Sequence, residues 1–252
     1  MEWSDEAFVL AVRPHGENAA VLTALTRDHG RHAGLVAGRN SLGQRGILLP
    51  GNELRVRWRA RLAEHLGHWR CEPARLRAGG LFDDAARLAG LSAACALLEG
   101  ALAERQPYPG LFASLTRLLD SLGGGSAWLG GYVTWELNLL RELGFGLDLT
   151  ACAATGAVED LRYVSPKTGR AVSGAAGAPY RDRLLPLPAF LVARARRTGA
   201  VEASVEEILQ GLAVTGYFLE RHVFAEKERA LPPARDRLLD CITRYATRSC
   251  GI

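Results

Sequence analysis

The sequence predicts an α+β protein in which a small β-barrel of the OB type comes first and a mainly helical part follows. Up to about residue 80, short apolar or alternating segments are separated by residues that favour turns. From residue 83 onward, apolar side chains recur at intervals of three and four residues, which is typical of helices. A chain of 252 residues with 48% hydrophobic residues suits one large domain or two to three small ones.

Five segments in the first third are expected to be strands. They cover residues 8–12, 19–26, 33–37, 53–62 and 65–76. Turn-forming residues separate them at 14–17, 28–30 and 50–52, and this spacing favours a small barrel. The connection at 38–46 is rich in glycine and is expected to be flexible; it carries Arg39 and Arg45.

The remaining chain is expected to form two groups of helices around an irregular insert. The first group covers 83–104, 111–122 and 126–143, and the second covers 189–198, 204–224 and 233–246. Ser204 and Glu207 have the spacing of a capping box at a helix start. We therefore expect a first domain at 1–80, a helical domain from 81–145 and 189–252, and an insert at 146–188.

Arginine occupies every second position from Arg55 to Arg61. Because side chains on a strand alternate faces, Arg55, Arg57, Arg59 and Arg61 would share one face and apolar residues the other. Four like charges in a row repel each other, and a polyanion such as nucleic acid would relieve that repulsion. The alternative is a solvated outer face of the sheet.

The positive charge of the chain is concentrated in the same region. Residues 1–80 hold twelve arginines and eight acidic residues, whereas acidic and basic residues are equal in number in the remainder. A local basic excess favours a local anion-binding surface. The predicted DNA-binding residues are Arg31, Arg39, Arg45, Arg55, Arg57, Arg59 and Arg61. Trp58 is expected to face the core, and Trp69 or His32 would offer a surface on which bases stack.

No catalytic constellation is visible, so we expect a protein that is not an enzyme and needs no cofactor. His65 and His68 would point to opposite faces of a strand, which argues against a metal site there. Five scattered cysteines do not indicate a disulfide framework. With neither a signal peptide nor a long apolar run, a cytoplasmic protein without membrane contact is expected.

Several segments, in this order and at this spacing, resemble the bacterial recombination-mediator RecO family. The N-terminal match includes Arg-Pro-His-Gly-Glu-Asn at 13–18 and Leu-Pro-Gly-Asn at 49–52. The resemblance continues through nearly the whole chain, at residues 21–26, 29–36, 58–62, 135–149, 163–172 and 184–188.

This resemblance implies an OB fold, a helical domain and a zinc-finger-like insert, with a role in DNA repair through the RecF-type pathway. It implies binding and annealing of single- and double-stranded DNA, partnership with RecR, and indirect help in loading RecA, near the nucleoid during repair. It also implies binding of the acidic C-terminal tail of single-stranded-DNA-binding protein, for which residues 212–224 and 235–239 are candidates.

Many members of this family carry four zinc cysteines in the insert. Here only Cys152 matches, because Thr155, Ser173 and Ala176 occupy the other three positions. Since one thiolate does not hold tetrahedral zinc, we expect no metal and an insert held by packing of Leu161, Tyr163, Val164 and Val172. The alternative function is a non-catalytic adaptor whose basic face binds an acidic protein partner.

Overall fold

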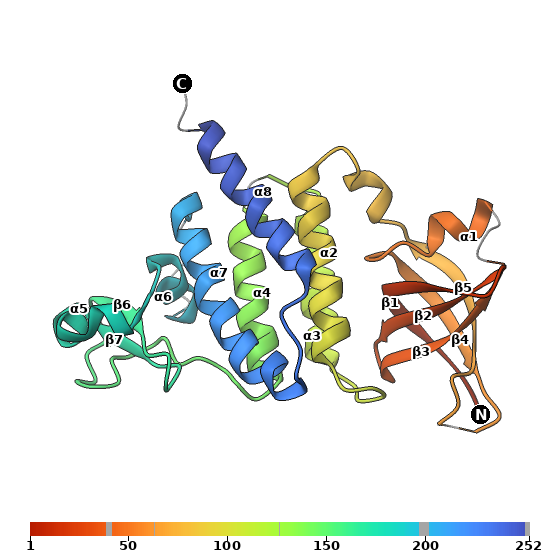
Figure 1. Cartoon of the computed structure of the whole chain (residues 1–252), viewed down its shortest axis with the longest axis horizontal. Helices are drawn as coiled ribbons and strands as arrows, with labels where there is room; N and C mark the ends of the chain where they lie inside the picture. The colour runs from red at the N-terminus through yellow and green to blue at the C-terminus, as the bar shows by residue number, and fades with distance from the viewer. Residues whose placement is uncertain (39–41, 63, 126, 197–201, 250–252) are drawn as a thin grey trace. The chain divides into compact units, whose positions relative to one another are not determined.

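The computed structural model describes residues 1–38, 42–62, 64–125, 127–196 and 202–249 (Figure 1). The chain forms two compact units, each described separately below. The first contains Met1–Gly123 and Pro232–Leu238, and the second contains Gly124–Leu231 and Leu239–Ile252. The final helix, α8 (Pro233–Ser249), belongs in part to each unit.

The first unit contains the predicted five-stranded barrel, which is confirmed. Its strands are β1 (Glu2–His15), β2 (Ala19–Thr26), β3 (Gly30–Ala37), β4 (Glu53–Arg59) and β5 (His68–Arg75). They close in the order β1-β2-β3-β5-β4. All neighbours are antiparallel except β3 and β5, which meet in parallel at Leu35 and His68.

Four strand predictions were wrong at their ends. β3 begins at Gly30 rather than at residue 33, and β5 covers His68–Arg75 rather than 65–76. β1 is longer than 8–12 because residues Glu2–Phe8 pair with β4 while the rest pairs with β2. β4 ends at Arg59 rather than at 62, since the chain turns away after Ala60. Arg61 is therefore exposed but lies beyond the strand that carries Arg55, Arg57 and Arg59.

The glycine-rich connection between β3 and β4 was predicted to be flexible, and this is wrong for its second half. Residues Leu42–Ile47 form the short helix α1, which ends against the barrel. Leu48 belongs to the barrel core and Ile47 packs against it. This contact outweighs the low helix propensity of the two glycines in the segment. Arg39 lies outside the described residues.

The barrel interior is filled by side chains from all five strands and the segment after α1. The core residues are Ala7, Val9, Leu22, Ala24, Val36, Leu48, Leu54, Val56, Trp58 and Trp69. Trp58 faces this core, as predicted. The prediction of Trp69 or His32 as a stacking surface was wrong, because both are buried beside Trp58 and Trp3.

A tight loop before β5 covers the indole ring of Trp58. The indole Nε1 donates to the carbonyl of Leu66 at 3.1 Å and to that of Ala33 at 3.3 Å. Gly67 has a φ of +68°, and a Cβ there would lie 2.5 Å from the indole. Glycine is required at this position both by the backbone conformation and by the close approach.

Two helices complete the first unit beside the barrel. α2 (Ala85–Ala101) begins at Asp84, whose side chain accepts from the backbone N–H groups of Ala86 and Arg87, and α3 covers Pro109–Ser121. Before them lies the 3-10 turn η1 (Ala78–Leu81). The buried amide of Asn52 joins barrel and turn: it donates to Gly46 and Ile47 and accepts from Arg77 and Ala78.

The second unit is built on the contact between α4 (Trp128–Glu142) and α7 (Val205–Leu219). Gly211 permits this approach, since a Cβ there would lie 2.9 Å from Val133. The capping box of α7 is confirmed, with reciprocal hydrogen bonds between Ser204 and Glu207. α6 (Ala189–Arg196) packs on both helices. After α7 the chain continues through the π-turn η3 (Glu220–Phe224) and the 3-10 turn η4 (Ala225–Lys227).

The insert, expected to be irregular, contains a small sheet. Its strands are β6 (Leu161–Val164), β7 (Ala171–Ser173) and β8 (Leu185–Pro186), in the order β7-β6-β8. α5 (Gly174–Gly177) and the 3-10 turn η2 (Ala178–Arg183) follow β7. Strands of two to four residues are too short for an alternating pattern to reveal them. Leu161, Val164 and Val172 are buried, and Tyr163 is half-buried.

Throughout the described part of the chain, every helix is too short or too polar to span a lipid bilayer.

Burial of His32 generates a prediction about pH. Burial holds the pKa of His32 below its ordinary value of 6.5, with a smaller opposing effect from the backbone of His29. The unfolded chain therefore takes up a proton more readily than the folded barrel as the pH falls below about 6.5. The His32 contribution to stability is present above that pH and lost as the pH falls through the folded pKa.

We expect His32→Phe to reduce the loss of unfolding free energy between pH 7.5 and pH 5.5, measured by urea denaturation, because phenylalanine takes up no proton. His15→Phe is the control, since His15 is exposed at the end of β1. An identical pH dependence in wild type and His32→Phe would contradict the assignment.

Candidate nucleic-acid interface

The outer side of β4 presents a row of arginines. Leu54, Val56 and Trp58 point into the barrel, and Arg55, Arg57 and Arg59 are exposed. The predicted alternation is thus present for three of the four arginines, with Arg61 just beyond the strand.

Side chains on β1 and β5, the two strands that pair with β4, determine which charges lie beside each arginine. On β1, Glu6, Ser4 and Glu2 are paired in register with Arg55, Arg57 and Arg59. On β5, the register partners are Glu72, Arg70 and His68, in the same order. The row therefore changes along its length, because Arg55 is flanked by two carboxylates, Glu6 and Glu72, whereas Arg59 is flanked by one carboxylate, Glu2, and by His68. We call Arg55, Arg57, Arg59 and Arg70 the arginine face.

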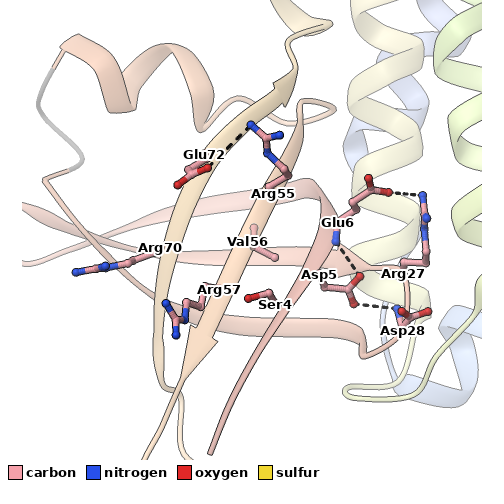
Figure 2. Close-up of a pocket in the computed structure, with 10 residues that line it drawn as sticks. All are labelled: Ser4, Asp5, Glu6, Arg27, Asp28, Arg55, Val56, Arg57, Arg70 and Glu72. Atoms are coloured by element: carbon pink, nitrogen blue, oxygen red, sulfur yellow. Dashed lines mark hydrogen bonds and ion pairs between the residues drawn. The ribbon is translucent and has the colours of Figure 1, made fainter.

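A groove of about 610 Å³ runs across this part of the barrel. Figure 2 shows Arg55, Arg57 and Arg70 beside it on β4 and β5, with Arg27 and Asp28 on its other side. Among the described residues, its lining holds four arginines, Arg27, Arg55, Arg57 and Arg70, and four carboxylates, Asp5, Glu6, Asp28 and Glu72. The guanidinium groups suit the phosphate oxygens of a nucleic-acid strand, whereas the carboxylates repel them.

Carboxylates engage part of the arginine face in the free protein. Arg57 forms an ion pair with Glu2 through its Nε, and Arg55 lies 4.0 Å from Glu72. Arg27 pairs with Glu6 at the edge of the groove. All of these side chains are substantially exposed, so each pair contributes little to stability, about 0–1 kcal/mol.

A second pocket, of about 770 Å³, lies where β4 ends, and none of the described residues that line it is acidic. It is lined by Met1, Arg59, Ala60, Arg61, His65, Gly67 and His68. His65 and His68 were predicted to point to opposite faces, but both line this pocket because β5 begins only at His68. Arg59 and Arg61 have no ion pair with any residue that the structure describes, so this end of the face is the more available to an anion.

The other predicted arginines lie elsewhere. Arg31 on β3 donates from Nε to the carbonyl of Leu102 at 3.0 Å and lies 3.7 Å from Glu104, so its guanidinium holds the barrel to the end of α2. Arg45 is exposed on α1. Figure 1 shows α1 and the N-terminus at opposite ends of the barrel, and Arg45 is not among the residues that line either pocket.

Several arginines in the basic first third serve the fold instead. Arg77 is only 7% exposed and pairs with Glu53 and Asp120, while Arg75 also pairs with Asp120. Arg13 pairs with Glu99 on α2. The excess of positive charge read from the sequence is therefore larger than the charge available to a partner.

Sequence reasoning missed Arg70 as a site residue. Its signal was present, because His68, Arg70 and Glu72 alternate with buried or half-buried Trp69 and Cys71. What the sequence did not supply was the register, which places Arg70 directly beside Arg57.

In the insert, Ser173 and Thr155, two of the three positions at which the resemblance led us to look for further zinc ligands, lie beside the sulfur of Cys152. Cys152 is buried, and its Sγ accepts from the backbone N–H of Ser173 at 3.3 Å. Burial raises the pKa of the Cys152 thiol, but hydrogen bonds from the hydroxyls of Ser173 and Thr155 and from backbone N–H groups outweigh burial and lower the pKa to about 6.

This donor set does not fit zinc. Cys152 supplies one thiolate, the hydroxyls of Ser173 and Thr155 are poor zinc ligands, and Ala176 supplies none. Elsewhere in the described ranges, no group of three or more His, Cys, Asp or Glu side chains is arranged to hold a metal ion.

Comparison with known proteins agrees with this architecture. Residues 1–74 match the family model described as Recombination protein O N terminal, and residues 83–232 match Recombination protein O C terminal. A protein from Rhodospirillum centenum named DNA repair protein RecO is 52% identical over 251 residues, covering 99% of this chain and 98% of that protein.

Two further proteins with the same name match over a similar length. The one from Ruegeria sp. is 50% identical and covers 97% of this chain and 99% of its own length. The one from Methylocella silvestris is 47% identical, with 99% of both chains covered. The barrel, the helices and these matches together show that the chain belongs to the RecO family of DNA repair proteins.

Proposed function

We propose that the chain is a recombination mediator of the RecF-type pathway that binds DNA through the arginine face, with Arg61 and the second pocket at its end. The observation that carries this proposal is the one-sided display of Arg55, Arg57 and Arg59 on β4, extended by Arg70. Guanidinium groups bind phosphates of single or double strands without reading base sequence.

The mechanism is electrostatic. Two complementary strands repel each other through their phosphates, and arginines that neutralise phosphates on both reduce that repulsion and favour annealing. We assign no catalytic step to the protein. Arg31 and Arg45 remain proposed contacts, although neither belongs to the arginine face.

The protein acts with partners in this proposal. It joins RecR, recognises the acidic tail of single-stranded-DNA-binding protein, and thereby helps RecA to load on coated DNA in the cytoplasm, at the nucleoid during repair. A contact with the tail holds the protein beside coated DNA, so the effective concentration of its arginine face at the DNA is raised.

The second unit offers a groove for the acidic tail. It has a volume of about 230 Å³ and lies between α4, residues 146–149 and α6. Leu137, Leu147 and Leu191 line it together with Arg141 and Arg194, and no acidic residue lines it within the described ranges. Leucines suit an aromatic side chain and the two guanidinium groups suit carboxylates. The groove lies outside the segments expected from the sequence, 212–224 and 235–239.

We also propose that the insert at 146–188 is a zinc-finger-like module that folds without zinc, between a first domain at 1–80 and a helical domain from 81–145 and 189–252. The hydrogen bonds to Cys152 and the burial of Leu161 and Val164 support this proposal, since they supply cohesion that metal ligands provide in other such modules.

The first experiment tests the arginine face. We expect Arg57→Ala with Arg59→Ala to weaken binding of single-stranded DNA of any sequence and to flatten the dependence of log K on log salt by about one to two units. Fluorescence anisotropy across a series of salt concentrations measures both. The matched control is Arg229→Ala with Arg237→Ala, two exposed arginines outside the barrel.

An unchanged affinity and slope would remove the arginine face from the DNA site. The same assay with a labelled acidic peptide tests the adaptor alternative. If the arginine face binds the peptide and not DNA, the adaptor function replaces the proposed one.

The second experiment tests the tail groove. We expect Arg141→Ala with Arg194→Ala to weaken binding of an acidic peptide ending in an aromatic residue about tenfold, because charge-assisted hydrogen bonds to its carboxylates are lost. Isothermal titration calorimetry measures this, with DNA binding as an internal control for folding. Equal peptide affinity in the wild type and the variant would place the tail elsewhere.

The third experiment tests the metal-free insert. We expect elemental analysis to find far less than one zinc per purified chain, and a chelator to leave the Tm unchanged, because Cys152 supplies one thiolate. Thr155→Cys with Ser173→Cys and Ala176→Cys should gain zinc if the backbone frame is retained. Stoichiometric zinc in the wild type would contradict the proposal.

A further inference from the structure

We propose that Glu2 is a built-in competitor of DNA phosphates for Arg57, so that the β1 edge of the arginine face limits how tightly the face binds DNA. This inference rests on the DNA-binding function proposed above. It adds a residue of opposite charge that limits affinity to a site otherwise defined by its arginines.

The competing contact is direct and uses a phosphate-binding atom. The Nε of Arg57 is paired with Oε1 of Glu2, on the strand next to β4. A phosphate oxygen that approached Arg57 side-on would need the same Nε–H. Binding through this edge of the guanidinium therefore requires the ion pair to open first. The loss of the Glu2 contact then offsets part of the Coulomb energy gained from the phosphate.

The position of Glu2 explains why a carboxylate is tolerated on a cationic face. Arg57 and Arg70 are register partners on β4 and β5, and like charges directly opposite each other on a sheet are destabilising. Glu2 approaches Arg57 from the other side, on β1. In the free protein, the carboxylate of Glu2 offsets the repulsion between Arg57 and Arg70. In the complex with DNA, phosphates offset that repulsion instead.

The exposure of both side chains indicates that a phosphate can replace Glu2 at Arg57. The side chain of Arg57 is 58% exposed and that of Glu2 is 38% exposed, so opening the pair uncovers no buried charge. Glu72 stands in the same relation to Arg55 but at 4.0 Å and with both side chains more exposed, so its competition is weaker. We therefore expect both carboxylates to lower the affinity for DNA, Glu2 by the larger factor.

The test is the affinity for single-stranded DNA of Glu2→Gln, measured by fluorescence anisotropy. Glutamine keeps the size of the side chain and removes its charge. We expect Glu2→Gln to bind about two- to five-fold more tightly than wild type, the range that loss of an exposed ion pair allows. Glu72→Gln should bind more tightly by a smaller factor.

Two controls separate the local contact from net charge and from folding. Glu226→Gln removes the same charge from an exposed position in the second unit and should leave the affinity near that of wild type. In an Arg57→Ala background, Glu2→Gln should have no effect, because the guanidinium for which Glu2 and phosphate compete is absent. Urea denaturation checks that each variant is folded.

The outcomes are distinct. If Glu2→Gln binds DNA as tightly as wild type, Glu2 does not compete, and if it binds more weakly, Glu2 positions Arg57; either result overturns the inference. It also fails if Glu226→Gln tightens binding equally, or if the effect of Glu2→Gln persists without Arg57. If folded wild type does not bind DNA at all, the proposed function itself fails, whatever the variants do.

Discussion

Burial of Trp58 is the constraint on which the candidate site depends. Its indole fills the barrel core, is 1% exposed, and donates to carbonyls of Leu66 and Ala33. Because side chains on a strand alternate, this one anchored residue fixes which side of β4 faces outward. A slip of one residue would bring arginines into the core and expose the apolar residues, at the large cost of burying unpaired charge.

The same constraint brings together residues that are remote in the sequence. Barrel closure sets β1 and β5 on either side of β4, so Glu2 and Arg70 become neighbours of Arg57. The resulting surface is not uniformly basic. Two carboxylates, Glu6 and Glu72, flank Arg55, whereas Glu2 and His68 flank Arg59. Because Arg59 and Arg61 form no ion pair with any described residue, this end of the arginine face is the more available to phosphate.

Patterns within one segment were enough for much of this fold. The bounds of β2, the capping box of α7 and the inward orientation of Trp58 follow from alternation and capping chemistry alone. The failures involve partners that are distant in sequence: α1 forms because Ile47 and Leu48 meet the barrel core. Distant partners also explain the errors at Arg31 and Arg70. Arg31, predicted to bind DNA, donates to the carbonyl of Leu102 after α2, whereas Arg70, which was not predicted, lies beside Arg57 through strand pairing.

The most direct test of the central claim follows the guanidinium groups themselves. Arginine Nε–H signals in two-dimensional NMR spectra, assigned by substitution, report each side chain during titration with a short single-stranded oligonucleotide. We predict that the signals of Arg57 and Arg59 shift progressively to saturation while those of Arg229 and Arg237 stay in place. If the β4 signals remain unchanged while DNA binds, the arginine face is a solvated surface and the DNA site lies elsewhere.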